Sequence, residues 1–175
     1  MSLEKIFTTQ LIGRLQKIDK QELDIEDGAR LLAQALVGEG SIYIYGEDEL
    51  EGVFLQAKFG QDPLPRVEKL TDDVLPSLST ADRVLIVTKN AQSEKVLELG
   101  KTLHEKQVSF MVLGVKDAKE VSPIENLAHA FVDLHLDKGL VPTMTGERKG
   151  FPYLLAALYV YHHMKFIIDD MIEDY

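Results

Sequence analysis

The chain has 175 residues, of which 45% are hydrophobic and 27% charged, a composition typical of one globular domain of ordinary size. Its 19 basic and 29 acidic residues give a formal net charge of −10, which disfavours binding to nucleic acid or to an anionic membrane but allows a small anionic ligand in a local pocket. Cysteine is absent, which excludes disulfides, thiol nucleophiles and cysteine metal sites and is typical of a reducing cytoplasm. The N-terminus lacks a signal-peptide pattern, and no apolar stretch reaches the roughly 20 residues of a membrane span. We therefore expect a cytoplasmic protein with one domain, residues 1–175.

Two helices are predicted before the first strand. Apolar residues recur every three to four positions over residues 3–18, and a second helix is expected over residues 24–40, with Asp24 as its N-cap. The β-branched and aromatic residues 41–45 predict a strand, which is followed by a helical pattern over residues 49–60.

The rest of the chain alternates strands with helices. Strands are predicted at residues 66–70, 82–88, 108–115 and 131–136, with helices at 93–107 and 122–130. A loop, 137–150, then leads to a long C-terminal helix. This alternation predicts an α/β fold, a three-layer α-β-α sandwich with a central parallel sheet.

The order of these elements resembles the SIS (sugar isomerase) fold, a flavodoxin-like sandwich, over nearly the whole chain. Residues 25–46 are similar to the segment of a phosphoheptose isomerase that precedes its glycine-rich loop, and residues 81–115 to the SIS core unit. Residues 121–136 resemble the Ser-Pro-Leu…Ala-Asp segment of these proteins, with Asp133 inside the last strand. "FTTQL", "IEDGARLLAQA" and "GERKGFPYLLAALYVYH" further resemble a narrower family of small bacterial proteins, some of which are described as phosphoheptose isomerases. The resemblance implies binding of a carbohydrate derivative and assembly into a dimer or tetramer.

The loop after the first strand departs from the SIS pattern, Gly-x-Gly-x-Ser. Gly46 matches the first glycine, but Asp48 stands at the second and Leu50 at the serine. The acids Glu47, Asp48 and Glu49 suit a helix N-terminus and disfavour a phosphate there. They are interpreted as a solvated first turn, with binding of sugar hydroxyls or a metal as the alternative.

The loop after the 82–88 strand retains more of its expected donors. SIS proteins have Ser-x-Ser-Gly-x-Thr here, and this chain has hydroxyls at Thr88 and Ser93, an amide at Asn90 and a cation at Lys89. Hydroxyls, backbone N–H groups and a helix N-terminus together can bind an anion. The alternative is ordinary capping of the helix by Ser93.

The catalytic residues of an aldose–ketose isomerase are not evident. The resemblance places the general base at or beside Phe59 and the glutamine of the closing helix at Leu154 or Leu155. None of these residues can transfer a proton as a general acid or base. His162 or His163 matches the histidine of that helix, and Glu47 is a further weak catalytic candidate. No two histidines have the spacing of a metal-ligand pair, so we predict neither a metal nor a cofactor.

Basic and hydroxyl residues gather in the loop 137–150. Arg148 is the residue there best suited to clamp a phosphate or carboxylate, and long loops are often functional. A surface loop that packs over the sheet edge or contacts a second subunit is an equal alternative.

Three functions follow from these residues. The first is a protein that binds a sugar phosphate or a similar small anion through Gly46, Thr88, Lys89, Asn90, Ser93 and Arg148. The second is an active sugar-phosphate isomerase with a relocated carboxylate, and the third is a structural or regulatory homodimeric module. A dinucleotide site would need Gly-x-Gly-x-x-Gly after the first strand, and the chain does not supply it.

Overall fold

The structure, a computed structural model, describes residues 2–175. Its centre is a five-stranded sheet in the order β2-β1-β3-β4-β5, and every pair of neighbouring strands is parallel. The strands are β1 (Ile42–Gly46), β2 (Val67–Lys69), β3 (Arg83–Val87), β4 (Ser109–Gly114) and β5 (Ala130–Asp133). This is the strand order of flavodoxin-like proteins, and it confirms the predicted parallel sheet.

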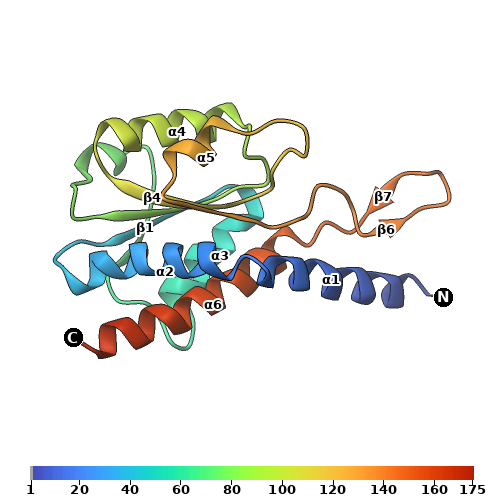
Figure 1. Cartoon of the computed structure of the whole chain (residues 1–175), viewed down its shortest axis with the longest axis horizontal. Helices are drawn as coiled ribbons and strands as arrows, with labels where there is room; N and C mark the ends of the chain where they lie inside the picture. The colour runs from blue at the N-terminus through green and yellow to red at the C-terminus, as the bar shows by residue number, and fades with distance from the viewer. Residues whose placement is uncertain (1) are drawn as a thin grey trace.

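Helices cover both faces of the sheet (Figure 1). One face carries α4 (Glu94–Glu105) and α5 (Pro123–Leu127), and the other carries α2 (Glu22–Val37), α3 (Gly52–Phe59) and α6 (Tyr153–Glu173). Each layer has its own cluster of buried apolar side chains. The predicted three-layer sandwich with a long C-terminal helix is confirmed. No helix within residues 2–175 is long and apolar enough to cross a membrane.

Two 3-10 turns complete the body of the sandwich. The first, η1 (Asp48–Glu51), joins the end of β1 to α3, and the second, η2 (Leu75–Ser77), lies between β2 and β3. The helix expected over residues 49–60 is thus two elements, and its first turn is tighter than an α-helix.

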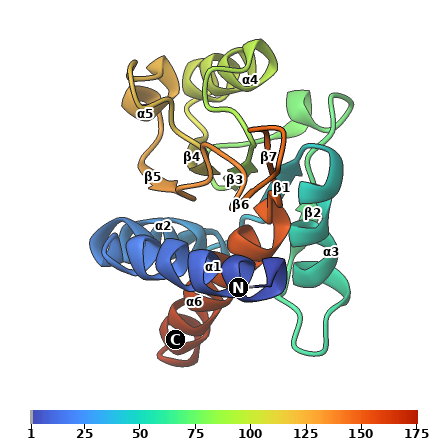
Figure 2. The same ribbon diagram turned by 90° about the vertical axis from the view of Figure 1, so that its right-hand side faces the viewer.

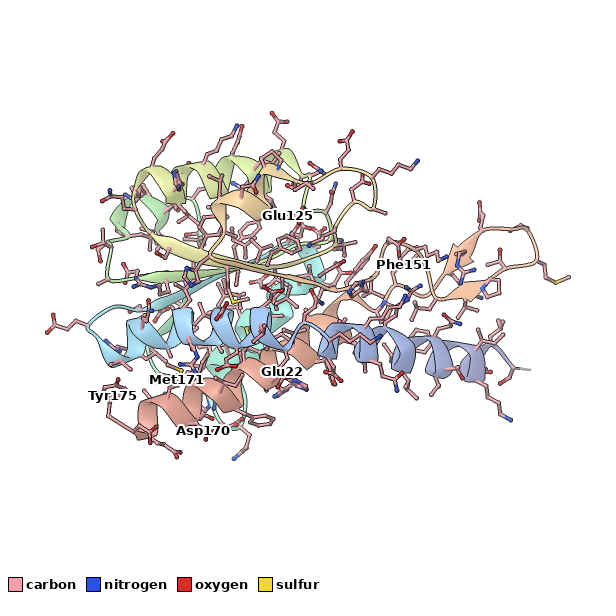
Figure 3. All side chains as sticks on the ribbon, in the orientation of Figure 1. Glu22, Glu125, Phe151, Asp170, Met171 and Tyr175 are labelled. Atoms are coloured by element: carbon pink, nitrogen blue, oxygen red, sulfur yellow. The ribbon has the colours of Figure 1, made fainter. Side chains whose placement is uncertain are left out.

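Helix α1 (Leu3–Asp19) and a small hairpin project together past one end of the sheet, as Figures 1 and 2 show. The hairpin pairs β6 (Val141–Pro142) with β7 (Arg148–Lys149) in antiparallel fashion. The sequence predicted only a loop here, because two-residue strands are too short to show alternation. Figure 3 labels Phe151 at the base of this hairpin, where the chain enters α6.

The start of α2 differs from the prediction. The helix begins at Glu22, so Asp24 lies in its first turn and is not its N-cap. Gln21 takes the N-cap position, and its side-chain amide both donates to and accepts from the backbone of Asp133, at 2.8 and 2.9 Å. A contact with β5, distant in sequence, therefore fixes where this helix begins.

Candidate functional site at the carboxyl ends of β1 and β3

The loops that follow β1 and β3 lie side by side. Gly46, the last residue of β1, is the register partner of Val87, the last residue of β3. Chain order reverses between these strands, because β2 lies on one side of β1 and β3 on the other. In open parallel sheets, ligands bind at the carboxyl ends of the strands where the order reverses. The candidate site predicted from the sequence lies at this position.

Gly46 allows the turn after β1 to fold back closely over the strand. A Cβ at this position would lie 2.6 Å from the backbone carbon of Leu50 and 2.8 Å from the nitrogen of Glu51. Asp48 has a φ of 50°, a left-handed conformation that glycine adopts most readily and that aspartate tolerates. The backbone at position 48 thus retains a glycine-like form although the residue is an acid.

Glu47 binds the loop after β3. Its Oε1 accepts a hydrogen bond from the hydroxyl of Thr88 at 2.8 Å and another from the backbone N–H of Lys89 at 2.5 Å. Thr88 is fully buried, and its hydroxyl oxygen also accepts from the backbone N–H of Asn90 at 3.1 Å. The loop therefore holds an oxyanion, and that oxyanion is a carboxylate of the same chain.

The side chain of Lys89 joins the other two acids of the first loop. Its Nζ lies 3.0 Å from Asp48 and 2.9 Å from Glu49. Hydrogen bonds to Glu49 and then to Asp48 raise the pKa of Lys89 above the ordinary lysine range. Asp48 and Glu49 are exposed, as the interpretation of a solvated first turn expects, whereas Glu47 is partly buried and bonds to the loop after β3.

Asn90 and Ser93 shape the start of α4. The side-chain oxygen of Asn90 accepts from the backbone N–H of Gln92 at 2.9 Å, which closes the turn before the helix. Ser93 occupies the N-cap position of α4 without a side-chain capping bond. Within the described residues, the Ser93 hydroxyl therefore does not cap α4, contrary to the alternative interpretation.

Arg148 lies in the hairpin and bonds to the hairpin itself. Its Nε donates to the carbonyl of Gly139 at 2.6 Å, and a terminal nitrogen donates to that of Leu140 at 3.3 Å. Among the described residues no hydrogen bond connects Arg148 with Glu47, Thr88 or Lys89. The structure thus gives this arginine a role in holding the hairpin together.

The two candidate histidines lie along α6 and away from these loops. His162 and His163 follow the first residue of α6 by nine and ten positions, which corresponds to roughly 14–15 Å of helix. His163 packs against Tyr159, with ring centroids 4.4 Å apart, and its Nδ1 lies 3.9 Å from Asp19. Residues 2–175 contain no group of three or more acids and histidines that could hold a metal ion.

Tyr153, which the sequence did not single out, lies within electrostatic range of the site. Burial raises the pKa of its hydroxyl, while the charge of Lys89 opposes this rise and that of Glu49 adds to it. The next residue, Leu154, packs on α3, where its Cδ1 would lie 2.8 Å from a Cβ at Gly52. No sequence pattern marks Tyr153, since it resembles any other aromatic residue of the apolar closing helix.

Comparison with known proteins decides the family. A family model described as a domain of unknown function (DUF2529) matches residues 3–172. The chain belongs to this family. The uncharacterized protein YwjG of Bacillus subtilis (strain 168) is 40% identical over 172 residues, which are 98% of either chain.

Solved structures place the DUF2529 chain among SIS folds. A phosphoheptose isomerase from Francisella tularensis superposes with a TM-score of 0.69 at 16% identity, covering 97% of this chain and 99% of the other. The Vibrio vulnificus NanR protein complexed with ManNAc-6P gives a TM-score of 0.70 at 11% identity, over 99% of this chain and 63% of NanR. This chain thus spans less than two thirds of NanR. The fold predicted from the resemblance is confirmed.

Proposed function

We propose that this protein binds a sugar phosphate at the carboxyl ends of β1 and β3, with the phosphate group bound by the loop after β3. One observation carries the proposal: the hydroxyl of Thr88 and the N–H of Lys89 already bind an oxyanion, the carboxylate of Glu47. Phosphate oxygens accept the same hydrogen bonds. The ligand would displace Glu47, and Lys89 would supply the positive charge.

The solved neighbours support this choice of ligand. NanR is complexed with ManNAc-6P, and the Francisella protein is a phosphoheptose isomerase. Because these likenesses concern the fold, the ligand class rests on the loop geometry together with them.

Binding of phosphosugars to the purified protein tests the proposal. A phosphosugar at 100 times its dissociation constant should stabilise the fold by about 2.7 kcal/mol, which a thermal-shift assay detects. Sedoheptulose 7-phosphate and ManNAc-6P are the first ligands, with the unphosphorylated sugars as controls. Thr88→Val, which removes the hydroxyl, should abolish the shift, and Thr88→Ser should retain it. An equal shift in wild type and Thr88→Val would place the ligand elsewhere.

The second candidate function is sugar-phosphate isomerisation with Glu47 as the base. The hydrogen bonds of the Glu47 side chain among the described residues all involve Oε1, which leaves Oε2 available to accept a proton. Exchange of the substrate's carbon-bound proton with deuterated water, followed by NMR, tests this candidate. Exchange that Glu47→Gln abolishes would establish an enzyme, whereas binding without exchange would leave a binding protein.

We also propose that the chain forms a homo-oligomer, a dimer or tetramer. Large apolar side chains remain exposed on α1, α3 and α6, among them Leu3, Ile12, Leu55, Phe59, Leu155 and Phe166. SIS proteins resemble one another in pairing, and a second copy would cover such side chains.

A further inference from the structure

A pocket of about 370 Å³ lies at the carboxyl ends of β4 and β5, beside α1. We call it the Arg14 pocket. It is lined by Arg14, Lys17, Lys116, Asp117, Ala118, Asp133, His135 and Asp137. None of these residues belongs to the loops after β1 and β3 that form the proposed sugar-phosphate site.

Arg14 distinguishes this pocket from an ordinary surface hollow. Its Nε is buried, and it is the one buried side-chain nitrogen or oxygen among residues 2–175 that has no hydrogen-bond partner. A buried N–H group of a charged side chain is costly to leave unpaired, and such groups in native proteins call for an explanation. An oxyanion in the pocket would supply the missing acceptor.

Some charged groups of the pocket already have a hydrogen-bond or ion-pair partner within the chain. Asp133 accepts from the backbone N–H of His135 at 2.9 Å, and its other oxygen lies 3.4 Å from the His135 ring nitrogen. Asp117 accepts from the backbone N–H of Lys119 at 2.8 Å. Lys116 pairs with Glu125, which Figure 3 labels on α5, at 3.0 Å.

Three side chains of the pocket, Arg14, Lys17 and Asp137, remain available to a ligand. Arg14 and Lys17, one turn apart on α1, have no ion-pair partner within the described part of the chain, and neither has Asp137. These two cations share the pocket with three carboxylates, of which Asp117 and Asp133 accept backbone N–H groups and Asp137 accepts none among residues 2–175. A ligand with one oxyanion for Arg14 and Lys17 and a hydroxyl for Asp137 satisfies all three.

The two walls of the pocket, α1 and the end of β5, are linked by hydrogen bonds. Gln21, between α1 and α2, bonds twice to the backbone of Asp133, so the end of α1 is fixed against the end of β5. A site whose groups are positioned before the ligand arrives loses less entropy on binding.

We propose that the Arg14 pocket is a second binding site, for a small hydroxylated molecule that carries a phosphate or carboxylate group. The site is independent of Thr88 and its loop. Its occupant would bind through the Arg14 guanidinium and the Lys17 ammonium.

Binding of inorganic phosphate and of glycerate, at constant ionic strength, tests the site. Amide NMR shifts should move at residues 14–17, 116–118 and 133–137, in wild type and in Thr88→Val alike. Arg14→Met should weaken this binding at least tenfold, and Lys17→Gln should weaken it as well. Lys101→Gln, the same charge change at an exposed position of α4, should leave it unchanged. A response to phosphate alone, or to glycerate alone, identifies which oxyanion the pocket accepts.

The unliganded variants separate ligand binding from a packing role. Because Arg14→Met removes an unpaired buried N–H, the apo variant should melt at the same temperature as wild type or higher. A lower melting temperature with an unchanged response at residues 133–137 would assign Arg14 to packing and overturn the proposal. If Arg14→Met does not fold, Lys17→Gln decides, and unchanged binding in it overturns the proposal. If the Arg14 pocket binds neither ligand, the Thr88→Val test of the sugar-phosphate site still stands. The two sites are therefore tested separately.

Discussion

At the scale of single residues, Glu47 uses the hydrogen-bond donors that an external oxyanion would use. Its carboxylate binds the Thr88 hydroxyl and the Lys89 N–H at the same time. Hydrogen bonds to charged groups contribute about 1.5–3 kcal/mol each to stability, so an incoming ligand must offset part of that amount. The chain thus supplies its own acceptor for these two donors.

Replacing Glu47 with glutamine should make the loop a better anion site. The variant keeps the size of the side chain but removes the negative charge that competes with a phosphate, so we expect affinity for inorganic phosphate to rise about tenfold, or about 1.4 kcal/mol. Isothermal titration measures the change. Glu51→Gln is the matched control, because it removes the same charge from a residue that pairs with Lys69.

Weaker phosphate binding in Glu47→Gln would contradict this model. It would mean that Glu47 contacts the ligand instead of competing with it, as the isomerase alternative requires.

At the scale of elements, the strands and helices were predictable where burial alone decides them. Residues 84–87 and 110–113 are apolar throughout because helices cover both faces of β3 and β4, and this pattern marks a central parallel strand. Parallel strands end at one edge, so the sequence also predicted that Gly46 and Thr88 lie close together. The match of Asp48 to the second glycine of the SIS pattern came from the resemblance.

Contacts between distant residues were not predictable in the same way. The pairing of Glu47 with Thr88, the bond of Gln21 to β5 and the hairpin that holds Arg148 all depend on which loops meet in space. No local propensity encodes these encounters. The interpretation of the acids after Gly46 as a solvated turn therefore suits the exposed Asp48 and Glu49 but misses the bonds of Glu47 to the neighbouring loop.

The packing of α2 on the sheet should be sensitive to one methyl group. A Cβ at Gly28 would lie 2.5 Å from Sδ and 2.6 Å from Cε of Met111, which is fully buried in β4. Overpacking of this kind costs about 1–3 kcal/mol, and the helix preference of alanine offsets roughly 0.5–1 kcal/mol of it, so Gly28→Ala should lower the free energy of unfolding by up to about 2 kcal/mol in urea titration.

Gly13→Ala is the matched control in α1. Nothing lies within 4 Å of its added Cβ, and alanine favours a helix interior over glycine by roughly 0.5–1 kcal/mol. The two substitutions should thus have opposite signs. Equal stabilisation by both would show that α2 sits further from the sheet than described.

At the scale of the whole molecule, the exposed apolar side chains predict self-association. Sedimentation at micromolar concentration should give a mass of two or four chains. Leu155, on the first turn of α6, is 46% exposed, and Leu155→Glu should shift the equilibrium toward monomer. Val121→Glu, at a 72% exposed position in the loop before α5, should leave the mass unchanged. A monomeric wild type would remove the homo-oligomer from the proposal.

Stability at alkaline pH is a property of the whole molecule because tyrosines from β1 and α6 contribute together. Burial is the main cause that raises the pKa above the ordinary 10.0 for five of the six tyrosines: Tyr43, Tyr45, Tyr153, Tyr159 and Tyr161. For Tyr159, the hydrogen bond that its hydroxyl donates to Asp19 at 2.9 Å raises the pKa further.

The sign of the effect follows from proton linkage. A tyrosine whose folded pKa is raised loses its proton first in the unfolded chain, so its stabilisation is complete below pH 10 and is lost as the pH rises through the folded pKa. The raised pKa of Lys89 acts in the same direction. We therefore expect constant stability at neutral pH and a cooperative loss above pH 10, in which tyrosinate absorbance and circular dichroism change together.

Tyr161→Phe should move that transition to higher pH, whereas Tyr175→Phe, at an 89% exposed position, should not. Gradual ionisation of the tyrosines without unfolding would contradict the burial that raises their pKa values.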